Sequence, residues 1–524
     1  MTEFKDATAV KCINGTFIGK IEGNVSKYLG IPFVAEQPTG KNRWKPPVPF
    51  EVDNGTYTAY EYGKTPCQNV TGGDSNYAGG EQGEDCLTLN VFVNYTDKNI
   101  KKPVMVWVHG GAFECGGANQ YDATPMVEAN PDVIVVLLEY RLGIFGFFDI
   151  GSLPGGEEFT STANLGFLDQ VMALKWVHEN IASFGGDPDN VTIFGQSAGG
   201  CSVAILALME MAKGYFKRAI AQSGTPVFMR RKETAADQAK HIMKKLGCSN
   251  VEEMMRLSAT EIVASTEAFD NMAVRDGVYF SEDPFDDYIK GRADGIDMMI
   301  GFVKDENRQF LCSMGGPDNF KSFFAPRTDP AIEHFSEEDR KSARDFLAER
   351  GNDGYAWERL YDQLAFNTPA AVLSDFHSVT GAKVYQYVFT QEAFKLKDLV
   401  AKGVDITKIE VFGPPDVDAP DMLASHGVEI AAIFNHREKN DEAFKFSEGF
   451  FKIIQRFWIN FAKTGDPTIP ASESPTGKEI VWPRYTKENP NIMILNEKLD
   501  MIKGWDDTPY VDKRLFYSYK YYAI

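Results

Sequence analysis

The stretch Val191–Gly200, VTIFGQSAGG, decides the expected fold of this 524-residue chain. Its first four residues are apolar or β-branched, as in a buried strand, and a helical pattern follows over Ser202–Met209. The intervening GQSAG segment, Gly195–Gly199, allows a tight turn that exposes the hydroxyl of Ser197 beside the N–H groups of a helix start. The stretch therefore predicts a nucleophilic serine rather than a serine that only caps a helix.

Similar apolar runs recur along the chain, with helical or loop segments between them. The alternation predicts an α/β fold with a mostly parallel central sheet, helices on both faces and long loop excursions. We expect a single elaborated domain over residues 1–524, because large α/β enzymes often lengthen their loops instead of adding a domain. The segments expected to be long loops, rich in Gly, Pro and Asp, are Thr71–Asp85, Gly315–Pro330 and Lys402–Pro420.

Charge and hydropathy limit the partners of the chain. A formal net charge of −20 would repel a phosphate backbone, so we expect no nucleic-acid partner. The most apolar stretch, Val133–Phe148, is interrupted by Glu139 and Arg141, so we expect no membrane span. The first residues, Met1–Asp6, lack a basic segment followed by an apolar one, which leaves a cytoplasmic protein or a secreted one whose signal has been removed.

A serine hydroxyl becomes a good nucleophile when an imidazole accepts its proton and a carboxylate orients that imidazole. In hydrolases with this turn, the acid and then the histidine follow the serine in the chain. Five histidines follow Ser197, and His426 is preferred because it lies in a loop just before the helical run Ile430–Phe434. The others, for which we expect structural or surface roles, are His241, His334, His377 and His436.

The acid is expected after the apolar run Met298–Val303. Ligand crevices in open α/β sheets lie outside the carboxyl ends of the strands. Asp305 and Glu306 both follow this run closely, so the residue pattern leaves both as candidates.

Backbone donors are needed for the negative oxygen of a tetrahedral intermediate. The apolar run Val104–Val108 leads into HGGAF at His109–Phe113, where small residues let backbone N–H groups approach a substrate closely. The predicted donors are the N–H groups of Gly111, Ala112 and Ala198. His109 is expected to support the loop, since it precedes the serine in the chain.

With these motifs in place, the sequence resembles the type B carboxylesterase family along almost its whole length. This family includes carboxylesterases, cholinesterases, juvenile hormone esterases and some fungal lipases. The matching motifs are LGIPF at Leu29–Phe33, Arg43-Trp44, EDCLTLNV at Glu84–Val91, YRLG at Tyr140–Gly143, FGF at Phe145–Phe147, NLG at Asn164–Gly166 and the segment Phe184–Gly199.

The resemblance implies an α/β-hydrolase fold and a serine esterase that acts on small-molecule carboxylic esters without a metal or an organic cofactor. It selects Glu306 over Asp305, because the acid of the family is usually a glutamate in such a segment. The implied catalytic triad is therefore Ser197, Glu306 and His426. The resemblance also implies a possible disulfide between Cys67 and Cys86.

Two features separate the sequence from the cholinesterases that it resembles. Those enzymes carry a tryptophan in the first disulfide loop and a glutamate before the nucleophilic serine, and both groups help to hold a quaternary ammonium. Residues 67–86 contain no tryptophan, and Gln196 precedes Ser197. We therefore expect a general carboxylesterase. The alternatives are a lipase-type or specialised ester hydrolase and, in another class, a non-catalytic adhesion or binding member of the family.

Overall fold

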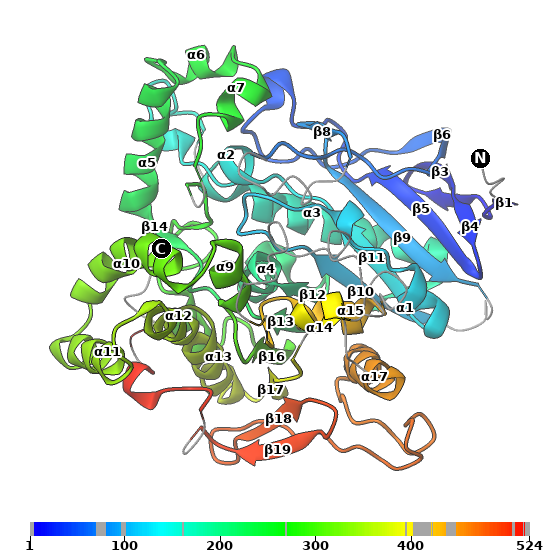
Figure 1. Cartoon of the computed structure of the whole chain (residues 1–524). Coiled ribbons are helices and arrows are strands. Elements are labelled where there is room, and N and C mark those ends of the chain that lie inside the picture. Colours follow the sequence, from blue (N-terminus) through cyan, green and yellow to red (C-terminus); the bar gives the residue numbers. More distant parts are fainter. Residues whose placement is uncertain are drawn as a thin grey trace. The chain divides into compact units, whose positions relative to one another are not determined.

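The computed structural model describes residues 5–69, 80–95, 101–159, 162–267, 270–392, 396–401, 421, 423–435, 447–505, 509–516 and 518 (Figure 1). Met1–Ala219 and Met229–Asp287 form a first compact unit, and Ile220–Phe228 and Tyr288–Ile524 form a second. Strand β13 (Arg218–Gln222) and helix α8 (Pro284–Ile289) each contain residues of both units. The expectation of one elaborated domain stays a prediction.

The first unit is built on a sheet in which β11, β10 and β12 run parallel. Antiparallel strands β9, β5, β4 and β1 continue this sheet beyond β11. The strands of this unit, as far as the described residues show them, are β1 (Lys5–Asp6), β2 (Val10–Cys12), β3 (Asn14–Ile18), β4 (Lys20–Glu22), β5 (Val25–Pro32), β6 (Asp53–Thr58), β7 (Thr65–Pro66), β8 (Gln82–Gly83), β9 (Thr88–Asn94), β10 (Lys102–Val108), β11 (Ile134–Leu138), β12 (Gly186–Gln196), β14 (Arg230–Arg231) and β15 (Val274–Arg275).

Helices α3 and α4 pack against β12 in this unit, and α1 packs against β9 and β5. Every residue of β10 and β11 is buried, which explains why these strands read as continuous apolar runs. The helices of the unit are α1 (Thr124–Ala129), α2 (Gly143–Gly146), α3 (Leu165–Asn180), α4 (Ala198–Leu206), α5 (Lys232–Lys245), α6 (Val251–Met255) and α7 (Ala259–Val263).

The second unit contains a sheet in which three parallel strands are followed by one antiparallel strand. The order is β16 (Asp297–Val303), β17 (Val384–Phe389), β18 (Asn491–Leu495) and β19 (Asp500–Lys503). Its helical segments are α9 (Arg308–Ser313), α10 (Pro317–Glu333), α11 (Glu337–Glu349), α12 (Gly354–Asp362), the π-helical turn η7 (Gln363–Asn367), α13 (Thr368–Ser378), α14 (Leu396–Ala401), α15 (Val428–Phe434) and α17 (Glu448–Thr464).

Helices cover both faces of β17. Tyr385 and Tyr387 contact Phe461 and Trp458 of α17, with ring centroids 5.7 and 5.3 Å apart. Gln386, which points to the opposite face because side chains alternate along a strand, is hydrogen-bonded to Ser374 of α13. Together with the parallel strands of both units, this arrangement confirms the predicted α/β class with its mostly parallel sheet.

One predicted loop is wrong. Gly315–Pro330 was expected to be a loop because of its glycines and prolines, but it forms most of helix α10, which contains Pro326 and Pro330. The helix buries Phe320, Phe324 and other apolar residues on one side. Burial of this apolar side compensates for the backbone hydrogen bonds that the prolines remove.

Of the other two predicted loops, one lies wholly and the other partly outside the described residues. Lys402–Pro420 and residues 71–79 lie outside the described residues, while β8 falls within the remainder of Thr71–Asp85. In the part of the chain that the structure describes, no helix combines the length and the apolar character that a membrane crossing requires.

Candidate active site

Ser197 lies at the turn between β12 and α4, with φ 60° and ψ −124°. A positive φ is strained for a residue with a side chain, and such strain is typical of residues held by their surroundings for a function. Ser197 is partly exposed, whereas Gln196 and Ala198 on either side are buried. The turn therefore presents the serine hydroxyl next to the first turn of α4, whose leading N–H groups have no acceptor within the helix.

The glycines on either side of Ser197 are required by close contact with β10. A Cβ added to Gly199 would lie 2.0 Å from the carbonyl oxygen of Val108, and one added to Gly195 would lie 2.7 Å from the same atom. No side chain fits at these distances. The backbone approach between β10 and the turn therefore explains the GxSxG spacing.

The loop that follows β10 lies against this turn. A Cβ added to Gly110 would lie 3.1 Å from the Cβ of Ser197. Gly111 and Ala112 both have positive φ, and the carbonyl of Gly111 accepts the N–H groups of Glu114 and Cys115 at 2.9 Å. The first unit thus brings the loop of the predicted oxyanion donors Gly111 and Ala112 to the turn that carries Ser197 and Ala198.

Glu306 and His426 form a buried pair in the second unit. His426 Nδ1 lies 2.5 Å from Glu306 Oε2, and the N–H of His426 donates to the carbonyl of Glu306 at 3.2 Å. The other carboxylate oxygen of Glu306 accepts the N–H of Val303 at 2.9 Å. Because a carboxylate binds Nδ1, the tautomer with the proton on Nδ1 is favoured, and Nε2 becomes the basic nitrogen.

Aromatic rings fix the His426 ring from the sides. The ring centroids of Phe366 and Phe310 lie 4.9 and 5.8 Å from that of His426. Phe366 belongs to the π-helical turn η7, a local irregularity that is frequent at functional sites. The packing of these two rings restricts rotation of the His426 side chain.

Asp305 and Glu306, which the residue pattern left as alternative acids, have different partners. Both side chains are fully buried. Asp305 is bonded to Arg359 and accepts the N–H of Ala424 at 3.3 Å, while Glu306 holds the imidazole. Only Glu306 is therefore in position to orient His426.

Helix α15 carries a further carboxyl group, which sequence reasoning alone did not identify. Glu429 is fully buried and accepts from Gln222 Nε2 at 3.3 Å, and Gln222 in turn accepts from the indole N–H of Trp458 at 3.0 Å. Burial, followed by repulsion from Glu306, raises the pKa of Glu429 to about 7. The available signal in the sequence was a single charged residue within the apolar run VEIAAIF.

Replacing Glu429 by glutamine is expected to change how stability depends on pH. The pKa rises from 4.5 in the unfolded chain to about 7 on folding, so the stability that this group contributes is complete below pH 4.5 and is lost as the pH rises to about 7. A shift of this size corresponds to roughly 3 kcal/mol. Relative to the wild type, the Glu429→Gln variant should therefore gain stability across this interval.

Urea unfolding of both proteins at about pH 5 and about pH 8 measures this gain. Glu448→Gln is the matched control, because the carboxylate of Glu448 is 64% exposed and should show no comparable gain. The expectation fails if the difference in the free energy of unfolding between Glu429→Gln and the wild type is the same at the two pH values.

The two cysteines and the other candidate histidines have the following positions in the described residues. Cys67 and Cys86 are free thiols that line one small pocket of the first unit, so the bridge implied by the resemblance is not formed in the structure. His377 is buried on α13, with Nε2 2.7 Å from the carbonyl oxygen of Ile296. His241 lies on α5 and His334 directly follows α10, while His436 lies outside the described residues.

Known proteins are similar to this sequence over almost its whole length. The model of the carboxylesterase family matches residues 6–510. The para-nitrobenzyl esterase of Bacillus subtilis is 32% identical, covering 95% of this chain and 96% of its own length. The liver carboxylesterase of Sus scrofa is 30% identical, over 93% of this chain and 89% of its own, and the acetylcholinesterase of Bungarus fasciatus is 30% identical, over 94% and 83%.

Solved structures agree with the family match. A thermophilic PNB esterase superposes with a TM-score of 0.77 at 30% identity, over 95% of this chain and 98% of its own. A Geobacillus stearothermophilus carboxylesterase gives a TM-score of 0.77 at 28% identity, with the same coverage of both chains. The chain therefore belongs to the carboxylesterase family of carboxylic-ester hydrolases and has the α/β-hydrolase fold.

Proposed function

We propose that the protein is a serine carboxylesterase of general substrate range, which hydrolyses esters through an acyl-enzyme on Ser197. In this mechanism His426 Nε2 takes the proton of Ser197 as its Oγ attacks the ester carbonyl. The N–H groups of Gly111, Ala112 and Ala198 hold the negative oxygen of the intermediate. The protonated histidine then gives its proton to the leaving alcohol.

The second half of the cycle repeats the same proton transfers with water. His426 takes a proton from a water molecule, whose oxygen attacks the acyl carbon, and returns the proton to Ser197 as the carboxylic acid leaves. Glu306 stabilises the imidazolium that forms in each half. Ser197, His426, Glu306 and the backbone donors supply all of this chemistry, so the proposed cycle needs no cofactor.

The observation that carries this proposal is the buried pair of Glu306 and His426, with 2.5 Å between Oε2 and Nδ1. A fully buried carboxylate that binds one imidazole nitrogen is the arrangement that makes the other nitrogen a base. The strained turn at Ser197 supports the same function independently, because it lies in the first unit and has its own geometric basis.

General carboxylesters are favoured over choline esters as substrates. Gln196, which is buried next to Ser197, carries no charge to attract a quaternary ammonium. Residues 67–86 supply no tryptophan to bind one. Acetylthiocholine should therefore react more slowly than a neutral thioacetate of similar size.

A fluorophosphonate probe and a panel of nitrophenyl esters of increasing acyl length test the proposal. The folded protein should be labelled on Ser197 and should hydrolyse the esters, while Ser197→Ala serves as the blank. Absence of labelling would favour a non-catalytic binding protein. A sharp rise in activity at an oil interface, or faster turnover of acetylthiocholine than of the neutral thioester, would replace the general esterase by a lipase or by a choline-specific enzyme.

A further inference from the structure

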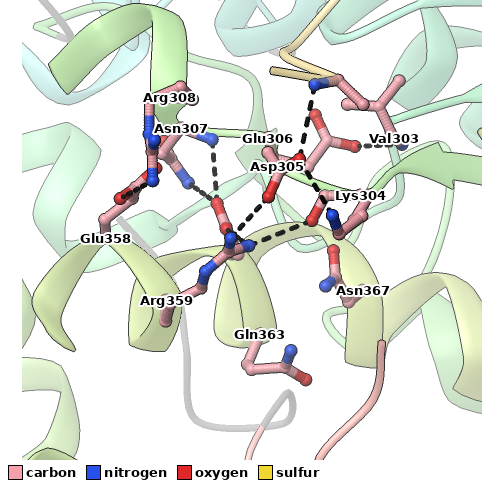
Figure 2. A network of polar contacts seen from close by, with 12 residues as sticks. Val303, Lys304, Asp305, Glu306, Asn307, Arg308, Glu358, Arg359, Gln363 and Asn367 are labelled. Atoms are coloured by element: carbon pink, nitrogen blue, oxygen red, sulfur yellow. Dashed lines mark hydrogen bonds and ion pairs between the residues drawn. The ribbon is translucent and has the colours of Figure 1, made fainter. Parts of the chain in front are cut away.

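We propose that Arg359 of α12 is a positioning residue, which holds the loop of His426 in place through the carboxylate of Asp305. This inference concerns the efficiency of the site and rests on the function proposed above. The residues involved all belong to the second unit, and Figure 2 shows Arg359 beside Lys304 and Asp305.

Three hydrogen bonds attach the loop that carries His426 to the end of β16. The N–H of Asp305 donates to the carbonyl of Ala424 at 3.0 Å, and the N–H of Ala424 donates back to Asp305 Oδ2 at 3.3 Å. The third bond is that between the N–H of His426 and the carbonyl of Glu306. The side chain of Asp305 thus completes the attachment two residues before His426.

Asp305 can attach the loop of His426 only if the negative charge of its carboxylate is compensated. Its carboxylate is fully buried, and a buried charge without a partner is strongly destabilising. Arg359 Nη2 binds Oδ1 of Asp305 and leaves Oδ2 for Ala424. Lys304 Nζ also lies 3.8 Å from Oδ2, but the lysine side chain is 36% exposed and its contribution is weakened by solvent.

Arg359 makes two further bonds that fix the guanidinium group. Its Nη1 donates to the carbonyl of Lys304 at 3.2 Å and to Asp362 Oδ2 at 3.3 Å. Asp362 Oδ1 accepts both the backbone N–H and the side-chain amide of Asn307, at 2.8 and 2.7 Å. Arg359 therefore connects the end of β16 to α12 on both sides of Glu306 (Figure 2).

The charges of this network explain why a neutral residue cannot replace Arg359. Three of its acids, Asp305, Glu358 and Asp362, are fully buried, and the guanidinium groups of Arg308 and Arg359 bind them. Burial, reinforced by Glu358, raises the pKa of Asp362 well above its usual range, whereas Arg359 lowers it. Loss of Arg359 would leave the buried carboxylate of Asp305 with only the partly exposed Lys304 as a cationic partner.

The direct test is Arg359→Met, which keeps the length and apolar stem of the side chain without the charge. We expect kcat per active site, counted with a fluorophosphonate probe, to fall about 10- to 100-fold, because small displacements of a catalytic base are costly, while KM changes little. Arg359→Lys should recover part of the loss. Added methylguanidinium should partly restore the kcat of Arg359→Ala, since the side chain of Arg359 is 34% exposed and solutes can reach the position that it leaves empty.

Arg344→Met is the matched control. Arg344, on α11, also binds two carboxylates, Asp329 at 2.6 Å and Glu333 at 2.9 Å, but none of these residues is bonded to the loop of His426. The kcat of Arg344→Met should equal that of the wild type. Equal losses in Arg344→Met and Arg359→Met, an unchanged kcat in Arg359→Met, or a loss that neither lysine nor methylguanidinium relieves would overturn the inference.

A second readout does not depend on turnover. The short bond between His426 Nδ1 and Glu306 should give a far-downfield proton resonance, which His426→Asn identifies by its loss. Arg359→Met should shift or broaden this signal, and Arg344→Met should leave it unchanged. The two proposals fail on different results. A wild type that hydrolyses no ester would refute the proposed function. An unaltered resonance in Arg359→Met would refute the positioning role of Arg359.

Discussion

Ser197→Ala and His426→Asn are each expected to lower kcat for nitrophenyl acetate about a millionfold, and the double variant should be no slower than either single variant. The serine is a weak nucleophile without its base, and the base has no proton to accept without the serine. Their losses therefore overlap completely. Steady-state kinetics of the four proteins, with the uncatalysed reaction subtracted, measures this directly.

Both substitutions are chosen so that the folded structure is preserved. Alanine retains the Cβ of Ser197, and asparagine places an amide nitrogen where His426 Nδ1 meets Glu306 at 2.5 Å, so the buried carboxylate keeps a donor. Unfolding midpoints should therefore remain close to that of the wild type. Losses that add in the double variant would mean that the two residues act separately, and the proposed triad would be wrong.

Glu306→Gln should lower kcat about ten-thousandfold, the size of effect expected when the imidazole is held in the wrong tautomer. One carboxylate oxygen of Glu306 accepts the N–H of Val303 at 2.9 Å. The carbonyl oxygen of a glutamine would keep that bond and turn its NH₂ group towards His426 Nδ1. The ring would then carry its proton on Nε2, which could no longer take the proton of Ser197.

Asp375→Asn is the control for loss of a partly buried carboxylate in the same unit. Asp375 accepts the hydroxyl of Tyr485 at 2.6 Å and has no bond to the predicted site residues. Its kcat should stay near that of the wild type. A Glu306→Gln variant with more than about a tenth of wild-type kcat would exclude Glu306 as the residue that orients the base.

Local patterns predicted much of the fold and several candidate site residues. The runs Val104–Val108 and Met298–Val303, which lie in β10 and β16, were recognisable because a strand buried on both faces is continuously apolar. The turn at Ser197 was recognisable because the carbonyl of Val108 leaves no room for a Cβ at Gly195 or Gly199. Helix α10 was missed because prolines disfavour a helix locally, whereas its stability comes from burial of Phe320 and Phe324.

The sequence by itself determined the turn around Ser197, the loop of the predicted oxyanion donors Gly111 and Ala112, and the position of His426 in a loop, since each depends on residues adjacent in the chain. Only the tertiary structure gave Asp305 and Glu306 their different partners, and only it brought in Arg359 and Glu429. The physical reason is that a buried carboxyl group is defined by its partner and its dielectric surroundings. For Asp305 that partner lies 54 residues away along the chain, and no local pattern specifies it.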